Sequence, residues 1–315
     1  MKFASLSVLA GVVTSSAPAC DLCSVYSATQ ARGEIGKGFY AGVAEQFSHF
    51  GTVQVDGRKA PNDVGQYLDS SISQLFAGYN FNDRFGLQLN LPVLYRSFKR
   101  PEGFEIDRGT ESGIGDASLI GNFLVYRRLQ ENFTFSCSVL GGIKFPTGGT
   151  DRLKEEFNEV ETPGAPESGI HGHDLTLGSG SFDGIVGAGM FTRWKRLFLT
   201  ANAQYAIRTK GDFDYQFAND LTWSGGPGIY LALGHQYTLA LQAVVSGERK
   251  DTDTFQGASA NDTGVTAVYL GPQLNFTWSG RLSAQAGADL PISIDNTALQ
   301  TVPDYRVRAA VNWRF

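Results

Sequence analysis

Residues 304–315 read Asp-Tyr-Arg-Val-Arg-Ala-Ala-Val-Asn-Trp-Arg-Phe. Apolar and polar side chains alternate along most of this stretch. The apolar set is Tyr305, Val307, Ala309, Val311, Trp313 and Phe315, and the polar set is Arg306, Arg308, Asn312 and Arg314. Successive side chains of a β-strand point to opposite faces of the sheet. The stretch therefore predicts a strand with one apolar face and one polar, largely basic face.

The same period of two recurs along the chain. Clear examples are residues 85–93, 133–141, 197–205 and 282–290. We count about twelve such runs of roughly ten residues, the length that a tilted strand needs to cross a bilayer. They begin near Phe39, Tyr67, Phe85, Gly115, Phe133, Ser181, Leu197, Leu221, Tyr237, Val265, Arg281 and Asp304.

The connections between these runs alternate in length. Short turns are predicted around residues 82–84, 129–131, 194–196, 234–236 and 278–280, and long polar loops at 51–66, 97–113, 147–180, 210–219, 248–264 and 293–303. Short turns on one side and long loops on the other are typical of outer-membrane barrels. We therefore predict an all-β fold, a transmembrane antiparallel up-and-down β-barrel of about 12 strands over residues 39–315. A soluble β-sandwich with its apolar face inside is the alternative fold.

Composition excludes several other classes of protein. The chain has 315 residues, a net charge of -5, 38 glycines and 12% aromatic residues. No apolar run approaches the ~20 residues that a membrane-spanning helix needs. The sequence has no cluster of Lys and Arg residues of the kind that would indicate a nucleic-acid partner. What remains is a glycine-rich and aromatic-rich chain that favours β-structure.

In a barrel that spans lipid, the polar positions of the strands face the inside. Backbone groups in hydrocarbon cannot bond to water, so the sheet must close, with one face toward lipid and one toward a lumen. The predicted lumen-lining residues are Gln88, Asn90, Asn122, Lys144, Asn202, Gln204, Arg208, Gln242, Gln273, Asn275, Gln285, Asp289, Arg306, Arg308, Asn312 and Arg314. Two interpretations of the cations in this set stay open. They form a basic stripe that favours anionic solutes, or they pair with Asp116, Asp183 and Asp289.

Residues 1–19 have the pattern of a secretory signal peptide. Lys2 is the only charge, residues 6–13 form a short apolar core, and Ala17-Pro18-Ala19 resembles a cleavage site. Cleavage there would make Cys20 the first residue of the mature chain. Acylation of Cys20, as in a lipoprotein, is the alternative.

Residues 20–38 are then expected to form a periplasmic tail that carries a C-x-x-C motif, Cys20-Asp21-Leu22-Cys23. Covalent c-type haem needs a His directly after the second Cys, and Ser24 stands there instead. In an oxidising periplasm a local disulfide between Cys20 and Cys23 is the simplest expectation. A redox, metal-handling or partner-docking role stays open, and this tail or an inward-folding loop could plug the lumen.

Short glycine and proline motifs mark the predicted strand ends. They are Leu91-Pro92, Gly113-Ile114-Gly115-Asp116, Lys144-Phe145-Pro146-Thr147-Gly148, Leu177-Gly178-Ser179-Gly180-Ser181 and Leu290-Pro291-Ile292. In this order, the chain from about residue 39 to residue 315 resembles the outer-membrane barrel family named after the meta-pathway of phenol degradation. The resemblance implies a barrel that helps small, often hydrophobic or aromatic, compounds across the outer membrane. The motifs set turns and strand ends and carry no chemistry themselves.

One cluster of possible metal ligands lies in the longest predicted loop, at His171-Gly172-His173-Asp174. Imidazole and carboxylate groups bind transition metals, so His171, His173 and Asp174 are candidates, but a solvated extracellular loop is the interpretation we favour. Residues 151–158 could form a short helix that acts as a lid if it folds inward. No Ser-His-Asp arrangement suits a hydrolase, and we expect neither enzyme activity nor a cofactor.

These features together predict an outer-membrane channel of a Gram-negative cell. It would let small molecules, hydrophobic, aromatic or anionic, diffuse passively through a polar lumen. Its expected partners are outer-membrane lipid, the solute and, through the terminal Phe315, the outer-membrane assembly machinery. The alternative function is a barrel whose Cys20 and Cys23 tail engages a periplasmic cytochrome or metal carrier.

Overall fold

Twelve long antiparallel strands form a closed barrel in the computed structural model, which describes residues 37–158 and 162–315. The strands are β1 (Gly38–Val55), β3 (Tyr67–Asn80), β4 (Phe85–Glu102), β6 (Ser118–Gln130), β7 (Phe133–Lys144), β8 (Asp183–Trp194), β9 (Leu197–Ile207), β11 (Asp220–Leu233), β12 (Tyr237–Lys250), β15 (Val265–Trp278), β16 (Leu282–Asn296) and β17 (Leu299–Arg314). Each strand pairs with its neighbour in sequence, and β17 pairs with β1 to close the sheet. The predicted fold and strand number are confirmed, and every predicted strand start lies within five residues of an observed one.

The closing seam joins the two ends of the described chain. The backbone of β1 pairs with β17 from Tyr40 opposite Arg314 to Val55 opposite Leu299. The Phe315 N–H donates to the Phe39 carbonyl at 3.0 Å, and the two rings lie 5.3 Å apart. No edge strand is therefore left open in the barrel wall at this seam.

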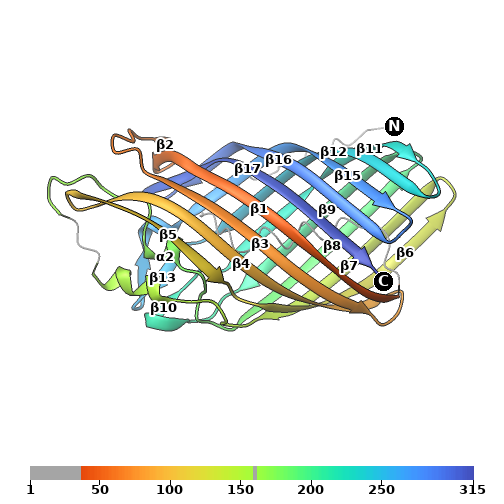
Figure 1. Ribbon diagram of the computed structural model, residues 1–315, viewed down its shortest axis with the longest axis horizontal. Coiled ribbons are helices and arrows are strands. Elements are labelled where there is room, and N and C mark those ends of the chain that lie inside the picture. Colours follow the sequence, from red (N-terminus) through yellow and green to blue (C-terminus); the bar gives the residue numbers. More distant parts are fainter. Residues whose placement is uncertain (1–36, 159–161) are drawn as a thin grey trace, which may run out of the picture.

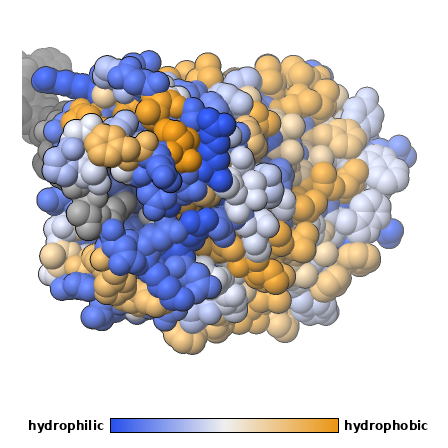
Figure 2. All heavy atoms as spheres, turned by 60° about the vertical axis from the view of Figure 1, so that its left-hand side comes forward, coloured by the Kyte–Doolittle hydropathy of each residue, from blue (hydrophilic) through white to orange (hydrophobic). Residues whose placement is uncertain are grey.

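Alternate side chains of each strand are buried inside the barrel or exposed outside it, as the period of two predicts. In β4, Asn90 and Leu94 are fully buried, whereas Leu89 and Tyr95 are about half exposed. An inner apolar cluster is formed by Ala44, Ile72, Phe76, Leu94 and Ala310, from β1, β3, β4 and β17. Figure 2 shows hydrophilic residues gathered toward the end that carries the long loops and hydrophobic residues over the wall beyond it.

The long connections carry structure that the sequence did not predict. The stretch 97–113, expected to be a loop, is a paired hairpin in which β4 continues to Glu102 and β5 (Glu105–Ile114) returns along it. Gly103 lies in the left-handed region, with φ 59°, which glycine accepts without strain and which allows this tight turn. The prediction was wrong here because the alternation continues past the expected strand end and the turn is only two residues long.

Shorter elements gather with this hairpin at the loop end of the barrel, opposite the C-terminus (Figure 1). They are β2 (Arg58–Lys59), η2 (Asp151–Phe157), α2 (Gly172–Leu175), η3 (Asp212–Asp214), β10 (Tyr215–Gln216), β13 (Asp253–Phe255), β14 (Ala258–Ala260) and η4 (Asn261–Thr263). β10, β13 and β14 form a small separate sheet. No helix among the described residues is long and apolar enough to cross a membrane.

Candidate functional site

The residues predicted to line the lumen all lie on the inner parity of their strands. Ten are buried: Gln88, Asn90, Lys144, Gln204, Arg208, Gln242, Gln273, Asp289, Arg306 and Asn312. The other six are half-buried: Asn122, Asn202, Asn275, Gln285, Arg308 and Arg314. In a closed barrel with an apolar outer face, burial of a polar side chain means that it points inward. That they line a path for solutes stays a prediction.

Polar side chains on the inner face are hydrogen-bonded to one another within β4, between neighbouring strands, and between β12 and β9. Asn90 accepts from the amides of Gln74 and Gln88 at 2.9 and 2.6 Å. Gln242 donates to Thr200 at 2.7 Å, and Asn275 donates to Gln242 at 3.4 Å. Such groups would be costly if left unpaired in a protein interior, and together they hold neighbouring strands in register.

A belt of alternating charges lies near the loop-side ends of β7, β8, β9 and β11. The Lys144 ammonium is 2.7 Å from carboxylate oxygens of both Asp116 and Asp183. Arg208 continues the belt, 3.0 Å from Asp183 and 2.6 Å from Asp220. All five side chains are 7% exposed or less. We name this chain of five side chains the charge belt.

Two cations of β17, Arg306 and Arg308, are also paired. Arg306 lies 2.6 Å from Glu248 and stacks over the Tyr269 ring at 3.9 Å. Arg308 lies 2.8 Å from Asp289. Of the two interpretations of the inner cations, the structure supports pairing, because Lys144, Arg208 and Arg308 contact the predicted Asp116, Asp183 and Asp289 partners.

The connection between β7 and β8 folds into the loop-side mouth of the barrel. We call its described part, residues 145–158 and 162–182, the inward segment. Leu153 of η2 is fully buried and packs with Tyr215 and Phe217. Glu155 of η2 lies 2.7 Å from Arg100 on the wall strand β4. The short helix that the sequence suggested at 151–158 is therefore present as a 3-10 helix, and it docks inward.

His173 lies at the centre of the contacts of this segment. Its ring is 6% exposed, with Nδ1 3.1 Å from Glu156 and Nε2 3.5 Å from Asp174. The other titratable groups around it are Tyr215 and His171, which stack on its ring, and Asp262. Burial opposes the charged imidazolium, but the carboxylates of Asp174 and Glu156 outweigh it and raise the pKa of His173 to about 10. His173 is therefore a buried cation that ties η2 to α2.

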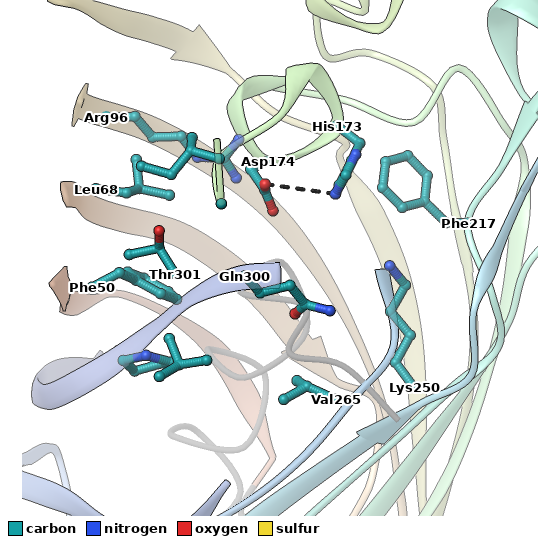
Figure 3. A pocket seen from close by; sticks show the side chains of 14 residues that line it. Phe50, Leu68, Arg96, His173, Asp174, Phe217, Lys250, Val265, Gln300 and Thr301 are labelled. Carbon is teal, nitrogen blue, oxygen red and sulfur yellow. Dashed lines mark ion pairs between the residues drawn. The ribbon is translucent and has the colours of Figure 1, made fainter. Parts of the chain in front are cut away.

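A cavity lies beside His173, at the loop-side mouth of the bore (Figure 3), and we call it the vestibule. Its lining consists of Phe50, Leu68, Arg96, Gly169, Ile170, His173, Asp174, Phe217, Lys250, Val265, Gln300, Thr301, Val302 and Pro303. One side is apolar, and the other carries three cationic groups and one carboxylate. Its volume is about 70 Å³, whereas an engineered protein cavity that binds benzene measures ~150 Å³. With the inward segment in this position, the vestibule has room for water molecules but not for an aromatic ring.

The ion pairs of His173 predict how the mouth responds to pH. The stabilisation from a group with a raised pKa is complete below its ordinary value, 6.5 for His, and is lost as the pH rises through about 10. Burial raises the pKa of Glu156, but His173 outweighs this effect and lowers it. The stabilisation from the charged Glu156 is therefore present above pH 4.5 and lost in stronger acid. We expect conductance in planar bilayers to be flat between about pH 5 and about pH 6.5, to rise as the pH increases from there to about 10, and to level off above it.

The matched variants are His173→Gln and His235→Gln, the second in an exposed short turn at the other end of the barrel. His173→Gln should conduct more at neutral pH and lose the alkaline rise, and His235→Gln should behave like the wild type. An alkaline rise of the same size in all three proteins would disprove the assignment to His173.

The structure corrects the expectation of a solvated loop around His171-Gly172-His173-Asp174. His173 is buried, because the loop folds into the barrel rather than outward. The rings of His171 and His173 are parallel at 5.6 Å, and the nitrogens of His173 face carboxylates. Within the described ranges, no group of three or more His, Cys, Asp or Glu side chains is arranged to hold a metal ion. Glu155 and Glu156 of the same connection pair with Arg100 and His173.

Other predictions fall outside the described part of the chain. The signal peptide at 1–19 and the tail with Cys20 and Cys23 lie there, so the disulfide and the docking role stay predictions. Cys137, within the described part, is a free, half-buried thiol on the outer parity of β7.

Sequence reasoning missed the cations of the mouth, Arg96, Arg100 and Lys250. All three are buried and lie on the inner parity of β4 or β12. Extending the alternation of inward and outward positions by two more periods along β4 and β12 would have found them. Arg100 and Lys250 were missed because Ser97 and Glu248 were taken as the starts of loops, and Arg96 was missed because the alternating run was followed only to Val93.

The fold is similar to that of the COG4313 outer membrane channel from Pseudomonas putida F1, with a TM-score of 0.63 and 15% identity over 90% of this chain and 98% of that chain. The β domain of the Bordetella autotransporter BrkA overlays with a TM-score of 0.47 and 11% identity, over 88% of this chain and 99% of that one. No protein-family model and no curated protein matches the chain. The fold is therefore that of a closed 12-stranded antiparallel barrel like those of outer membranes.

Proposed function

We propose that this protein is an outer-membrane channel that lets small molecules cross by passive diffusion. The observation that carries the proposal is the closed barrel whose outer face is apolar and whose inner face is hydrogen-bonded and charged. A barrel with this distribution is stable in lipid and offers a polar path through it. The likeness to a protein described as an outer membrane channel agrees with this proposal.

The solutes that we propose are small molecules with an apolar, often aromatic, body. The apolar half of the vestibule, with Phe50, Leu68 and Val265, supports this choice. The sequence motifs that resemble the meta-pathway barrel family support the same class of compound. Because the vestibule is smaller than one aromatic ring, transport requires the inward segment to shift.

Purified protein in planar bilayers tests the channel itself. We expect discrete conductance steps of small size from the wild type, since the inward segment narrows the mouth. Heat-denatured protein, added in the same way, is the control and should give none. A barrel that stays electrically silent even after the inward segment is removed would contradict the proposal.

Uptake by cells that lack their general porins tests the solute class. Expression of the protein should speed the entry of a labelled single-ring aromatic more than that of a labelled disaccharide. Equal acceleration of both compounds would leave a channel but would contradict the proposed solute.

A further inference from the structure

The charges at the mouth of the barrel come from two different parts of the chain. The wall strands supply cations, with Arg96 and Arg100 on β4 and Lys250 on β12. The inward segment supplies carboxylates against them, with Glu155 on Arg100 at 2.7 Å and Asp174 inside the vestibule. At these two positions the segment therefore places carboxylates near wall cations, and it also carries cations of its own, His173 and Arg152.

The wall cations have further partners, two on neighbouring strands and one in the inward segment. Lys250 lies 2.6 Å from Asp253, Arg100 lies 3.1 Å from Asp107, and Arg96 donates to the Thr176 carbonyl. These contacts fix the cationic groups in place, and of the three only Arg96 has a neutral partner, a backbone carbonyl, among these contacts. A preorganised cation needs little rearrangement when an anion arrives.

Among the described residues that line the vestibule, Asp174 is the one that carries a carboxylate. Figure 3 shows it between Arg96 and His173, with its carboxylate directed into the space that Lys250 and Gln300 approach from the other side. Its oxygen is 3.5 Å from His173 Nε2, which is a longer contact than the 2.7 Å pair between Glu155 and Arg100. Burial disfavours the charged form of Asp174, but the nearby cations, His173 foremost and Lys250 among them, outweigh it and lower its pKa.

The opposite side of the same cavity has no charge. Phe50 of β1, Leu68 of β3, Val265 of β15 and Val302 of β17 line it, and all four are buried. A ligand that satisfies both sides needs an apolar body and an anionic group within one small molecule. A purely apolar solute would strip water from three cations without replacing it, which costs free energy.

We propose that the vestibule is a recognition site for small organic anions, and that the Asp174 carboxylate occupies the place that the solute's carboxylate takes during entry. The inference rests on the proposed channel function and names the solute class of the same entrance. An arriving carboxylate competes with Asp174 for Arg96, His173 and Lys250. Displacement of Asp174 loosens α2, so the solute itself favours the shift that makes room for its apolar body.

Three compounds with one ring and different charges test this recognition. Sodium benzoate, benzyl alcohol and benzylamine are titrated by calorimetry into the purified, folded protein in detergent at neutral pH. Benzoate should bind roughly tenfold more tightly than the other two, since one charge-assisted hydrogen bond contributes about that much. Equal binding of the three, or tightest binding of benzylamine, would overturn the proposal.

Two substitutions should shift benzoate binding in opposite directions. Lys250→Gln should weaken it roughly tenfold, and Asp174→Asn should tighten it several-fold, because the competing carboxylate is gone while the amide oxygen can still accept from the His171 N–H. Lys154→Gln, on the exposed face of η2, is the control and should leave it unchanged. General damage to the fold would weaken binding in every variant, so a gain with Asp174→Asn is the decisive result, and its absence would contradict the competition.

The outcomes also separate this inference from the channel function. Conductance steps without a preference for benzoate would keep the channel and remove the anion site. Benzoate binding by a barrel that never conducts would keep the site and remove the channel. Folding of each variant is checked by the shift in its electrophoretic mobility on heating.

Discussion

Replacing Lys144 with methionine is expected to lower the free energy of unfolding by about 3 kcal/mol, because breaking a buried ion pair leaves its partner charged and uncompensated. Lys144 is one of the two cations of the charge belt and contacts Asp116, Asp183 and the Ser179 hydroxyl. Arg208 still neutralises Asp183 in the variant. Asp116 keeps only neutral hydrogen bonds, from Gly148 and Ser179 among others, so most of the loss arises there.

Urea titration of the barrel reconstituted in lipid vesicles measures this loss. The double variant Lys144→Met with Asp116→Asn should recover part of the stability, since it removes the orphaned charge together with its former partner. Lys154→Met is the matched control, because its pair with Asp151 is exposed to water. If the double variant were less stable than Lys144→Met alone, the pairing account would be wrong.

Removing the part of the inward segment that fills the mouth is expected to raise single-channel conductance several-fold, since the constriction sets the resistance of a narrow pore. Backbone hydrogen bonds show where the two ends of the deleted stretch can be joined. The N–H groups of Leu177 and Gly178 donate to the Gly149 carbonyl at 3.1 and 2.9 Å, so residues 149 and 176 lie close together. Replacing residues 150–175 by two glycines therefore closes the gap without disturbing the charge belt.

The deletion also removes Asp174 and His173, so two consequences follow together. The alkaline rise in conductance should vanish, and a ring-sized solute should no longer need to displace the segment. Arg152→Gln is a milder form of the same test, because Arg152 joins η2 to Glu111 of β5. A deletion variant with the conductance of the wild type would show that the narrowest point lies deeper in the bore.

The inner face could be read from sequence because it depends on local geometry alone. A residue such as Arg306 faces inward because its neighbours Tyr305 and Val307 must face lipid, whatever strand lies beside it. The partner of Arg306 could not be predicted in this way. Glu248 lies 58 residues away on β12, and it meets Arg306 only because the barrel closes and brings the two strands to the same cavity.

The loop-side mouth shows the same difference between what local sequence determines and what the tertiary structure determines. Alternation predicted the strands and the alternation of loop lengths predicted which end bears the loops, but nothing in the pattern at 147–180 says whether that loop leaves the barrel or enters it. Leu153 is buried inside the mouth because it packs against the aromatic side chains of Tyr215 and Phe217, which come from another loop and exclude water from the contact. Burial of His173 then follows from that docking and not from its own neighbours.

The sequence by itself thus determined the strand number, from the count of alternating runs, and the closed sheet, which lipid requires. It also determined which side chains of those runs face inward or outward, since a period of two fixes direction within a single strand. Only the tertiary structure decided which charges pair, that the β7–β8 connection fills the mouth, and that Asp174 and Lys250 share one cavity. Those features depend on side chains that are distant in sequence, and their free energy is gained only when the whole barrel has closed around them.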